Sequence, residues 1–229
     1  MTVGSANLLN PSEPSVTGVL FDLDGTLLDS AHEICNSANY ILNQFSAKNY
    51  SVEEIRPLIG LPAKEIFTNA GITENINYVV EDFRKHLGET GGDPKYIYPG
   101  VIQGLNEIKR MEIPLVVATN KPTELATRVL EKSGLLRFFD LVQGSDNLPN
   151  KPEPDILKTA AKKVGSALYS TWMVGDSYVD IRASKAAGCI SVGVIYHQDY
   201  AQSMIVETPD FLVSSIVELK KVIEKNAKR

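Results

Sequence analysis

One short segment, residues 19–26, places two carboxylates directly after a run of apolar residues. It reads Val-Leu-Phe-Asp-Leu-Asp-Gly-Thr, so Asp22 and Asp24 follow the apolar residues 19–21. A run this apolar is typical of a strand buried on both faces, as in a parallel sheet covered by helices. Ligands of such sheets bind beyond the carboxyl ends of the strands. The segment therefore predicts an α/β fold whose binding site includes Asp22 and Asp24.

The spacing of the two aspartates also suggests chemistry. Residues two apart in a strand point the same way, so the two carboxylates face one small volume and repel each other unless a cation or a proton lies between them. One aspartate can attack phosphorus and form an aspartyl-phosphate, while its neighbour acts as general acid and then as general base. The alternative is a solvated loop in which Gly25 supplies a turn and one aspartate caps a helix.

Composition limits the classes of partner. The chain has 229 residues, 43% of them hydrophobic and 22% charged, with a formal net charge of -5. It is long enough for one domain with a large insertion or for two modest domains. We expect neither a nucleic-acid nor a membrane partner, because no basic run and no apolar run of about 20 residues is present. Cys35 and Cys189 have no metal-ligand or disulfide spacing, so a reducing cytoplasm is the expected location.

The pattern along the chain divides it into three parts. Residues 1–15 are predicted to be a flexible tail without the features of a signal peptide. Residues 29–97 have helical periodicity, and we expect helices over residues 30–44, 52–58, 63–69 and 75–89. The second of these begins with Ser51 as N-cap and has Glu54 three residues later, as in a capping box. This helical segment is predicted to be a cap that covers the site like a lid.

Short apolar strands and helices alternate in the rest of the chain. Strands are expected over residues 115–119, 141–144, 171–175, 191–195 and 211–213. This alternation predicts a doubly wound parallel α/β sheet, to which the strand at residues 19–21 also belongs. The core domain would then comprise residues 16–28 and 98–229, with the all-helical cap domain of residues 29–97 inserted after the first strand.

Polar residues that suit a phosphate site follow three of the later strands. Thr119 and Asn120 offer a hydroxyl and backbone N–H groups near a helix start, where a helix cap is the alternative. Lys151 precedes two prolines that stiffen its backbone. Its ammonium group would neutralise the charge of a phosphate and pair with Asp22; the alternative is a lysine exposed to solvent. Asp176 ends another strand, with Asp180 four residues later, and carboxylate oxygens suit Mg²⁺.

These four motifs, in this order, resemble the haloacid dehalogenase superfamily, specifically its phosphoglycolate phosphatase-like branch with a helical cap after the first strand. The resemblance covers roughly residues 16–219 and implies a Rossmann-like core. It implies that Asp22 is the nucleophile and Asp24 the acid and base. Thr119 and the Asn120 amide would bind the transferring phosphoryl group, and Lys151 would orient and neutralise it.

The resemblance further implies a Mg²⁺ cofactor, held by Asp22, Asp176 and the backbone carbonyl of Asp24, with Asp180 supporting the metal indirectly. The implied function is hydrolysis of a small organic phosphate monoester, phosphoglycolate-like, through an aspartyl-phosphate. The implied partner is that small molecule, and the protein is expected to be a monomer or a homodimer. Substrate choice is assigned to the cap loop of residues 59–64, with Gly60, Leu61 and Lys64 as candidate specificity residues.

Other functions on the same fold remain open. Dehalogenation is disfavoured because the dehalogenating branch lacks the carboxylate at the position of Asp24. A mutase of the β-phosphoglucomutase type would have a histidine and an arginine where this chain has Ile34 and Ala63. Phosphonate cleavage would need a cap lysine that forms a Schiff base. Lys64 lies near the right loop, but we interpret it as an exposed lysine on a helix. A phospho-ligand-binding or regulatory protein without turnover is the remaining alternative. Surface or packing roles are expected for the three histidines, His32, His86 and His197.

Overall fold

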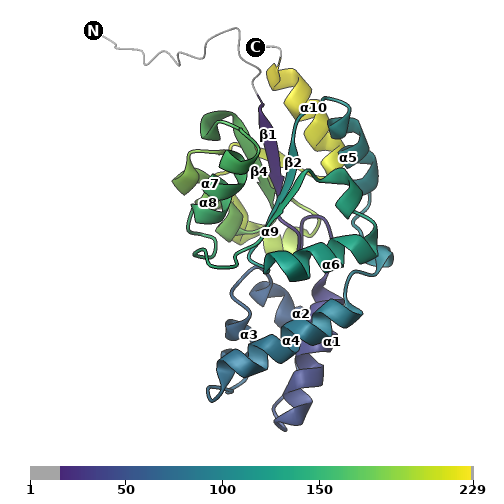
Figure 1. Cartoon of the computed structure of the whole chain (residues 1–229), viewed down its shortest axis with the longest axis vertical. Helices are drawn as coiled ribbons and strands as arrows, with labels where there is room; N and C mark the ends of the chain where they lie inside the picture. Colours follow the sequence, from purple (N-terminus) through teal and green to yellow (C-terminus); the bar gives the residue numbers. More distant parts are fainter. Residues whose placement is uncertain (1–15, 228–229) are drawn as a thin grey trace, which may run out of the picture.

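The computed structural model describes residues 16–227, which include a six-stranded parallel sheet with helices on both faces (Figure 1). The strand order across the sheet is β3-β2-β1-β4-β5-β6. This arrangement confirms the predicted doubly wound α/β fold. The strands are β1 (Gly18–Phe21), β2 (Leu115–Ala118), β3 (Leu141–Gln143), β4 (Thr171–Gly175), β5 (Ile190–Val194) and β6 (Phe211–Val213).

The first strand shows why the central strands are apolar throughout. Val19 and Phe21 belong to the hydrophobic cluster that includes residues of α5 (Val101–Lys109), α6 (Thr123–Ser133) and α10 (Ile216–Ala227). Leu20 points to the opposite face, into the cluster formed with α7 (Asp155–Lys163) and α8 (Tyr178–Ala187). Successive side chains of a strand point to opposite faces, and both faces of this sheet are covered. All four residues of β1 are therefore buried.

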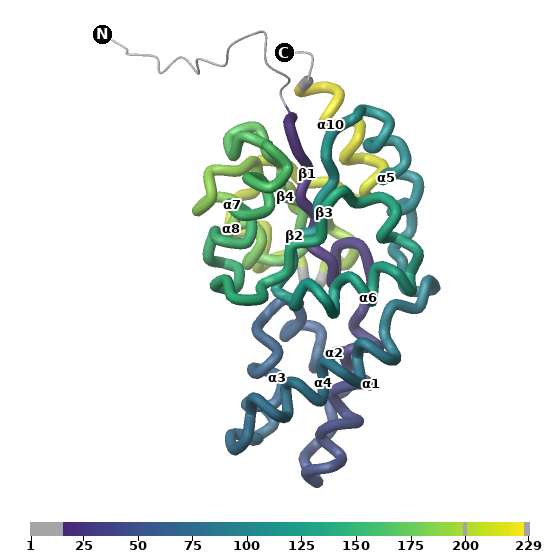
Figure 2. The backbone as a smooth tube through the Cα atoms, in the orientation of Figure 1, coloured from purple at the N-terminus to yellow at the C-terminus, as the bar shows by residue number. Residues whose placement is uncertain are grey.

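The helical segment between β1 and α5 lies beyond one end of the sheet (Figure 2). Within it, α1 packs against α4, and α3 also packs against α4. The rings of Phe67 and Phe83 meet edge to face with their centroids 5.4 Å apart. The segment therefore has apolar packing of its own. Its elements are α1 (Ala31–Gln44), α2 (Val52–Ile55), η1 (Arg56–Leu58), α3 (Lys64–Asn69), α4 (Ile76–Thr90) and η2 (Pro94–Tyr96).

Local sequence signals explain where these helices begin and end. The predicted capping box is present, because the Glu54 N–H donates to Ser51 Oγ at 3.2 Å and the Ser51 N–H donates to Glu54 Oε2 at 2.8 Å. The helix expected over residues 52–58 is instead divided into α2 and the 3₁₀ turn η1. Pro57 lies in that turn and lacks the N–H needed to continue an α-helix.

Three further elements complete the core: η3 (Leu136–Phe138), η4 (Leu168–Ser170) and α9 (Gln198–Ile205). Cys35 and Cys189 are both buried and unpaired. No helix between residues 16 and 227 is both long enough and apolar enough to cross a membrane. The tail expected at residues 1–15 lies outside the described residues.

The close packing of α5 against α10 depends on Gly104. A Cβ atom there would lie 2.5 Å from the carbonyl carbon of Ile216. We expect Gly104→Ala to lower the free energy of unfolding by about 2 kcal/mol in urea denaturation, through overpacking. In a helix without this contact, the same change would raise stability by about 1 kcal/mol. Gln103→Ala, at the exposed neighbouring position, is the control and should change stability by less than about 0.5 kcal/mol. A stabilised Gly104→Ala protein would contradict the packing described.

Candidate active site

The site lies where the winding of the sheet changes direction. The chain runs outward from β1 through β2 and β3, and then returns to the other side of β1 as β4. Such a switch point leaves a crevice at the carboxyl ends of the two central strands, where ligands bind. Asp22 follows β1 and Asp176 follows β4. The Asp22 N–H donates to the Val174 carbonyl at 2.9 Å, which fixes the two strand ends side by side.

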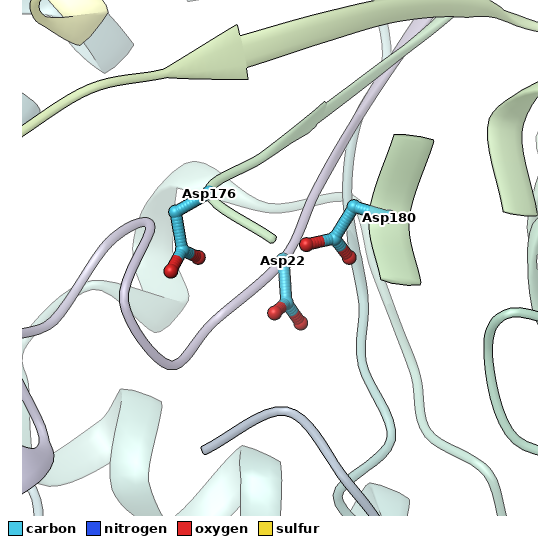
Figure 3. Close-up of side chains that lie close together, drawn as sticks. All are labelled: Asp22, Asp176 and Asp180. Atoms are coloured by element: carbon cyan, nitrogen blue, oxygen red, sulfur yellow. The ribbon is translucent and has the colours of Figure 1, made fainter. Parts of the chain in front are cut away.

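Three carboxylates meet at this crevice, from Asp22, Asp176 and Asp180 (Figure 3). One oxygen from each lies within 4.8 Å of the others. The pKa of Asp22 is raised to about 6, chiefly by burial; Lys151 opposes the increase, and the charges of Asp180 and Asp24 add to it. Burial also raises the pKa of Asp176 well above its usual value, with Asp180 and Asp22 adding to the effect. Each shift reflects negative charge held out of water.

Lys151 supplies a positive charge at the centre of this cluster. Its Nζ lies 2.9 Å from Asp22 Oδ1 and 2.6 Å from Asp180 Oδ1, and it donates to the Ala118 carbonyl at 2.9 Å. Burial opposes the charged form of Lys151, but Asp180 and Asp22 outweigh that effect and raise its pKa. One ammonium group does not balance three ionised carboxylates. The all-oxygen donor set therefore suits a hard divalent cation such as Mg²⁺.

Two glycines make room for the carboxylates. Gly25 has a φ of +83°, and a Cβ atom at this residue would overlap the carboxylate of Asp176. The next residue, Thr26, donates its hydroxyl to Asp176 Oδ1 at 2.8 Å. A Cβ atom at Gly175 would overlap the side chain of Asp180 in the same way. Glycine at these two positions thus allows the loop after β1 and the end of β4 to approach the acidic cluster.

Asp180 has a second, structural contact besides its ion pair. Its Oδ2 accepts from Ser177 Oγ at 2.6 Å and from the Ser177 N–H at 3.2 Å, which closes the first turn of α8. Asp180 is fully buried, and its other oxygen contacts Lys151. These contacts hold one oxygen of Asp180 against Lys151 and the other against the first turn of α8.

Asp24 lies apart from the three-carboxylate group and pairs with a lysine that the sequence interpretation missed. Lys121 Nζ lies 2.6 Å from Asp24 Oδ2, and both side chains are almost completely buried. The other oxygen of Asp24 is buried without a hydrogen-bond partner among residues 16–227. The sequence signal that could have identified Lys121 is its position, two residues after Thr119 at the end of the same strand.

Thr119 and Asn120 lie at the carboxyl end of β2, as expected. Thr119 is buried, and its Oγ1 accepts from the Lys121 N–H at 3.2 Å. The Asn120 side chain has a role that the sequence did not reveal. Its Oδ1 accepts from the Lys151 N–H at 2.7 Å, and its Nδ2 donates to the Gly60 carbonyl at 2.8 Å. The side chain of Asn120 therefore connects the loop that contains Lys151 with the loop that contains Gly60 in the helical segment.

A cavity of about 560 Å³ lies between the helical segment and the sheet edge. Asp22, Asp24 and Thr119 line it from the sheet, and the proposed specificity residues line it from the opposite side. Those residues are Gly60, Leu61 and Lys64. The structure thus brings Asp22, Asp24, Thr119 and the loop of residues 59–64 around one space, and Lys151 contacts Asp22 at its edge.

A second cavity, of about 310 Å³, lies beside Asp176. His197 lines it and lies 3.9 Å from a carboxylate oxygen of Asp29. The other two histidines make the packing contacts expected of them, because His32 stacks on Tyr96 and His86 on Tyr40.

The fold is thus a doubly wound α/β sheet with a buried lysine and a cluster of carboxylates at its switch point, and this cluster has the composition of a site that can hold a cation. The family model described as haloacid dehalogenase-like hydrolase matches residues 19–194. The chain belongs to this family.

Curated relatives and solved structures agree with this assignment. The phosphoglycolate phosphatase of Escherichia coli (strain K12) is 30% identical, with 89% of this chain and 91% of the relative covered. That of Neisseria meningitidis is 35% identical, covering 92% and 95%. A crystal structure of a predicted phosphatase from Clostridium acetobutylicum has a TM-score of 0.81 and 28% identity, covering 92% of this chain and 99% of that one. These matches confirm the predicted class of enzyme, a phosphatase of this family.

The raised pKa of Asp22 makes cation binding depend on pH. The folded protein favours the protonated carboxyl of Asp22. Without a cation, the protonated Asp22 therefore stabilises the fold at low pH, and this stabilisation is lost as the pH rises through about 6. A divalent cation requires the ionised form. We therefore expect the affinity for Mg²⁺ to fall as the pH is lowered below about 6, with protons released on binding.

Calorimetry in buffers of different ionisation enthalpy measures this proton release. Asp22→Asn should release fewer protons than the wild type at pH 6, because the titrating carboxyl is gone. An affinity for Mg²⁺ that is the same at pH 5.5 and pH 7.5 would contradict the prediction.

Proposed function

We propose that this protein is a Mg²⁺-dependent phosphatase that hydrolyses a small organic phosphate monoester, phosphoglycolate-like, through an aspartyl-phosphate on Asp22. The observation that carries the proposal is the pairing of Asp22 with Lys151 at 2.9 Å, on the wall of a cavity that Asp24 and Thr119 also line. Relatives named phosphoglycolate phosphatase, at 30% and 35% identity, support the choice of substrate.

In the first step, Asp22 attacks the phosphorus atom and the leaving alkoxide departs on the opposite side. Lys151 orients Asp22 and offsets negative charge on the phosphoryl oxygens, while Thr119 Oγ1 and the Asn120 N–H bind those oxygens. Phosphate monoesters react extremely slowly without a catalyst, so most of the acceleration must come from charge stabilisation and alignment. The buried position of Lys151 strengthens its effect, because little water screens it.

Asp24 moves the protons in both steps. It protonates the leaving alkoxide, then accepts a proton from the water that attacks the aspartyl-phosphate. Asp24 would thus begin the cycle protonated, and Lys121, 2.6 Å from its Oδ2, would stabilise the carboxylate that remains between the two proton transfers.

The acidic cluster is the proposed site of the cation. Asp22, Asp176 and the Asp24 carbonyl would hold Mg²⁺, with Asp180 supporting it through its neighbours. When bound, Mg²⁺ offsets the charge of the phosphoryl oxygens. The carboxylate oxygens, and the absence of nitrogen or sulfur donors from this cluster, favour Mg²⁺ over softer metals.

The helical segment is proposed to act as the cap domain, with residues 16–28 and 98–229 as the core domain. Gly60, Leu61 and Lys64 face the nucleophile across the cavity, where the leaving group would lie. Closure would exclude water from the reacting atoms. We further propose a cytoplasmic monomer or homodimer whose partner is a small phosphate ester, with neither a nucleic-acid nor a membrane partner.

The direct test measures phosphate release from p-nitrophenyl phosphate and from phosphoglycolate, with Mg²⁺ and with EDTA. We expect activity only with Mg²⁺, and a loss of at least about 10³-fold in kcat for Asp22→Asn, because the nucleophile is removed. Asp82→Asn is the matched control, since Asp82 lies on α4 but does not line the cavity. Activity in EDTA, or full activity of Asp22→Asn, would overturn the mechanism. No turnover by the wild type would favour the binding or regulatory alternative.

A mutase is distinguished by a second assay. A β-phosphoglucomutase from Clostridium difficile shares the fold, with a TM-score of 0.76 at 21% identity. Ile34 is buried and lines the cavity, as does Ala63, so neither position supplies the polar group expected of a mutase. We expect free phosphate and no glucose 6-phosphate from β-glucose 1-phosphate. Accumulation of glucose 6-phosphate before free phosphate would reverse this choice.

A further inference from the structure

Helix α4 presents a polar stripe to the cavity. Asn77, Glu81 and Arg84 all line the cavity, and their spacing of i, i+4 and i+7 places them on one side of the helix. Asp24 and Lys121 line the same cavity from the sheet edge. A ligand that extends from Asp22 toward the helical segment would therefore approach α4 as well as the cap loop.

Arg84 is the member of this stripe whose charge is least satisfied. Its Nε is buried and has no hydrogen-bond partner among residues 16–227. Its Nη1 lies 3.9 Å from Glu81 Oε2, at the limit of an ion pair, and the Glu81 side chain is 76% exposed. Water screens such a pair, so it contributes little. A buried donor on a charged group without an acceptor is unfavourable and points to a missing partner.

Three of the other arginines in the described chain differ in this respect. Each of the three has a carboxylate oxygen close by, at 2.8 Å for Arg56, 2.6 Å for Arg128 and 2.7 Å for Arg182. Arg84, whose side chain is 37% exposed, has only the 3.9 Å contact with Glu81, although it lines a cavity of about 560 Å³. Lys64 lines the same cavity but is exposed, so water surrounds and screens its charge.

We propose that Arg84 determines specificity by binding a second anionic group, a carboxylate, on the leaving-group part of the substrate. The inference rests on the proposed phosphatase function and narrows its substrate class to phosphate monoesters that carry a carboxylate. A guanidinium group offers a planar pair of donors that matches both oxygens of a carboxylate. The phosphoryl group would lie against Asp22 and Lys151, and the carboxylate would bind at α4.

The test compares two esters of similar size that differ in charge, phosphoglycolate and 2-hydroxyethyl phosphate. Arg84→Gln should lower kcat/KM for phosphoglycolate by about 10-fold to 100-fold, as expected for the loss of hydrogen bonds to a charged group. It should lower kcat/KM for 2-hydroxyethyl phosphate much less, because that ester has no carboxylate for Arg84 to bind. Arg84→Lys, which keeps the charge without the planar pair of donors, should lie between Arg84→Gln and the wild type.

Lys85→Gln is the matched control, because it removes one positive charge from the adjacent, exposed position of α4 outside this cavity. It should not change the ratio of kcat/KM for the two esters. An equal loss on both esters in Arg84→Gln would assign Arg84 a merely structural role and overturn the inference. A selective loss in Lys64→Gln, with Arg84→Gln unaffected, would also overturn it.

A binding measurement on the wild type needs no variant and no turnover. 3-Phosphonopropionate has the shape of phosphoglycolate, whereas propylphosphonate lacks the carboxylate. Calorimetry in the presence of Mg²⁺ should show at least about 10-fold tighter binding of 3-phosphonopropionate, and Arg84→Gln should abolish this difference. Equal affinities for the wild type would overturn the inference. Failure of the wild type to hydrolyse either ester, with the difference in affinity intact, would contradict the phosphatase function alone.

Discussion

The organisation of this active site depends on one buried ammonium group. Lys151 Nζ contacts Asp22 after β1, Asp180 on α8 and the Ala118 carbonyl at the end of β2. Three separate elements therefore converge on one positive charge that water does not reach. Burying isolated carboxylates would be very unfavourable, and pairing with Lys151 offsets part of that desolvation. The position of the lysine thus fixes Asp22, the proposed nucleophile, and the negative charge that it leaves unbalanced is the basis for the proposed cation site.

The sequence was sufficient to locate most of this arrangement, because strand ends in a parallel sheet have a predictable position. Apolar runs followed by polar residues predict that Asp22, Thr119 and Asp176 lie at one edge of the sheet. Lys151 was the harder case, since it follows no strand directly and lies in a loop after β3. The family resemblance, rather than periodicity, assigned its role. Boundaries were less exact: β5 begins at Ile190, one residue before the expected start.

The contacts that sequence reasoning missed are those between segments far apart in the chain. Lys121 pairs with Asp24 across 97 positions, and Asn120 reaches Gly60 across 60. No pattern of hydrophobicity or spacing encodes these pairs, because they depend on how the helical segment sits over the sheet. Arg84 was missed for the same reason. In a helix rich in charged residues it looks like a solvated side chain, and only the fold shows that part of its guanidinium is buried.

The bond between Asn120 and Gly60 has a consequence for how this kind of enzyme changes its substrate during evolution. Asn120 donates to the backbone carbonyl of Gly60 and not to a side chain. Every residue in the cap loop has such a carbonyl, so neighbouring positions can be replaced without removing the acceptor. Gly60 itself, with a φ of +86°, is the residue that sets the path of the loop. The residues proposed to bind phosphate can thus stay constant while substitutions in the loop around Gly60 change which substrate is preferred.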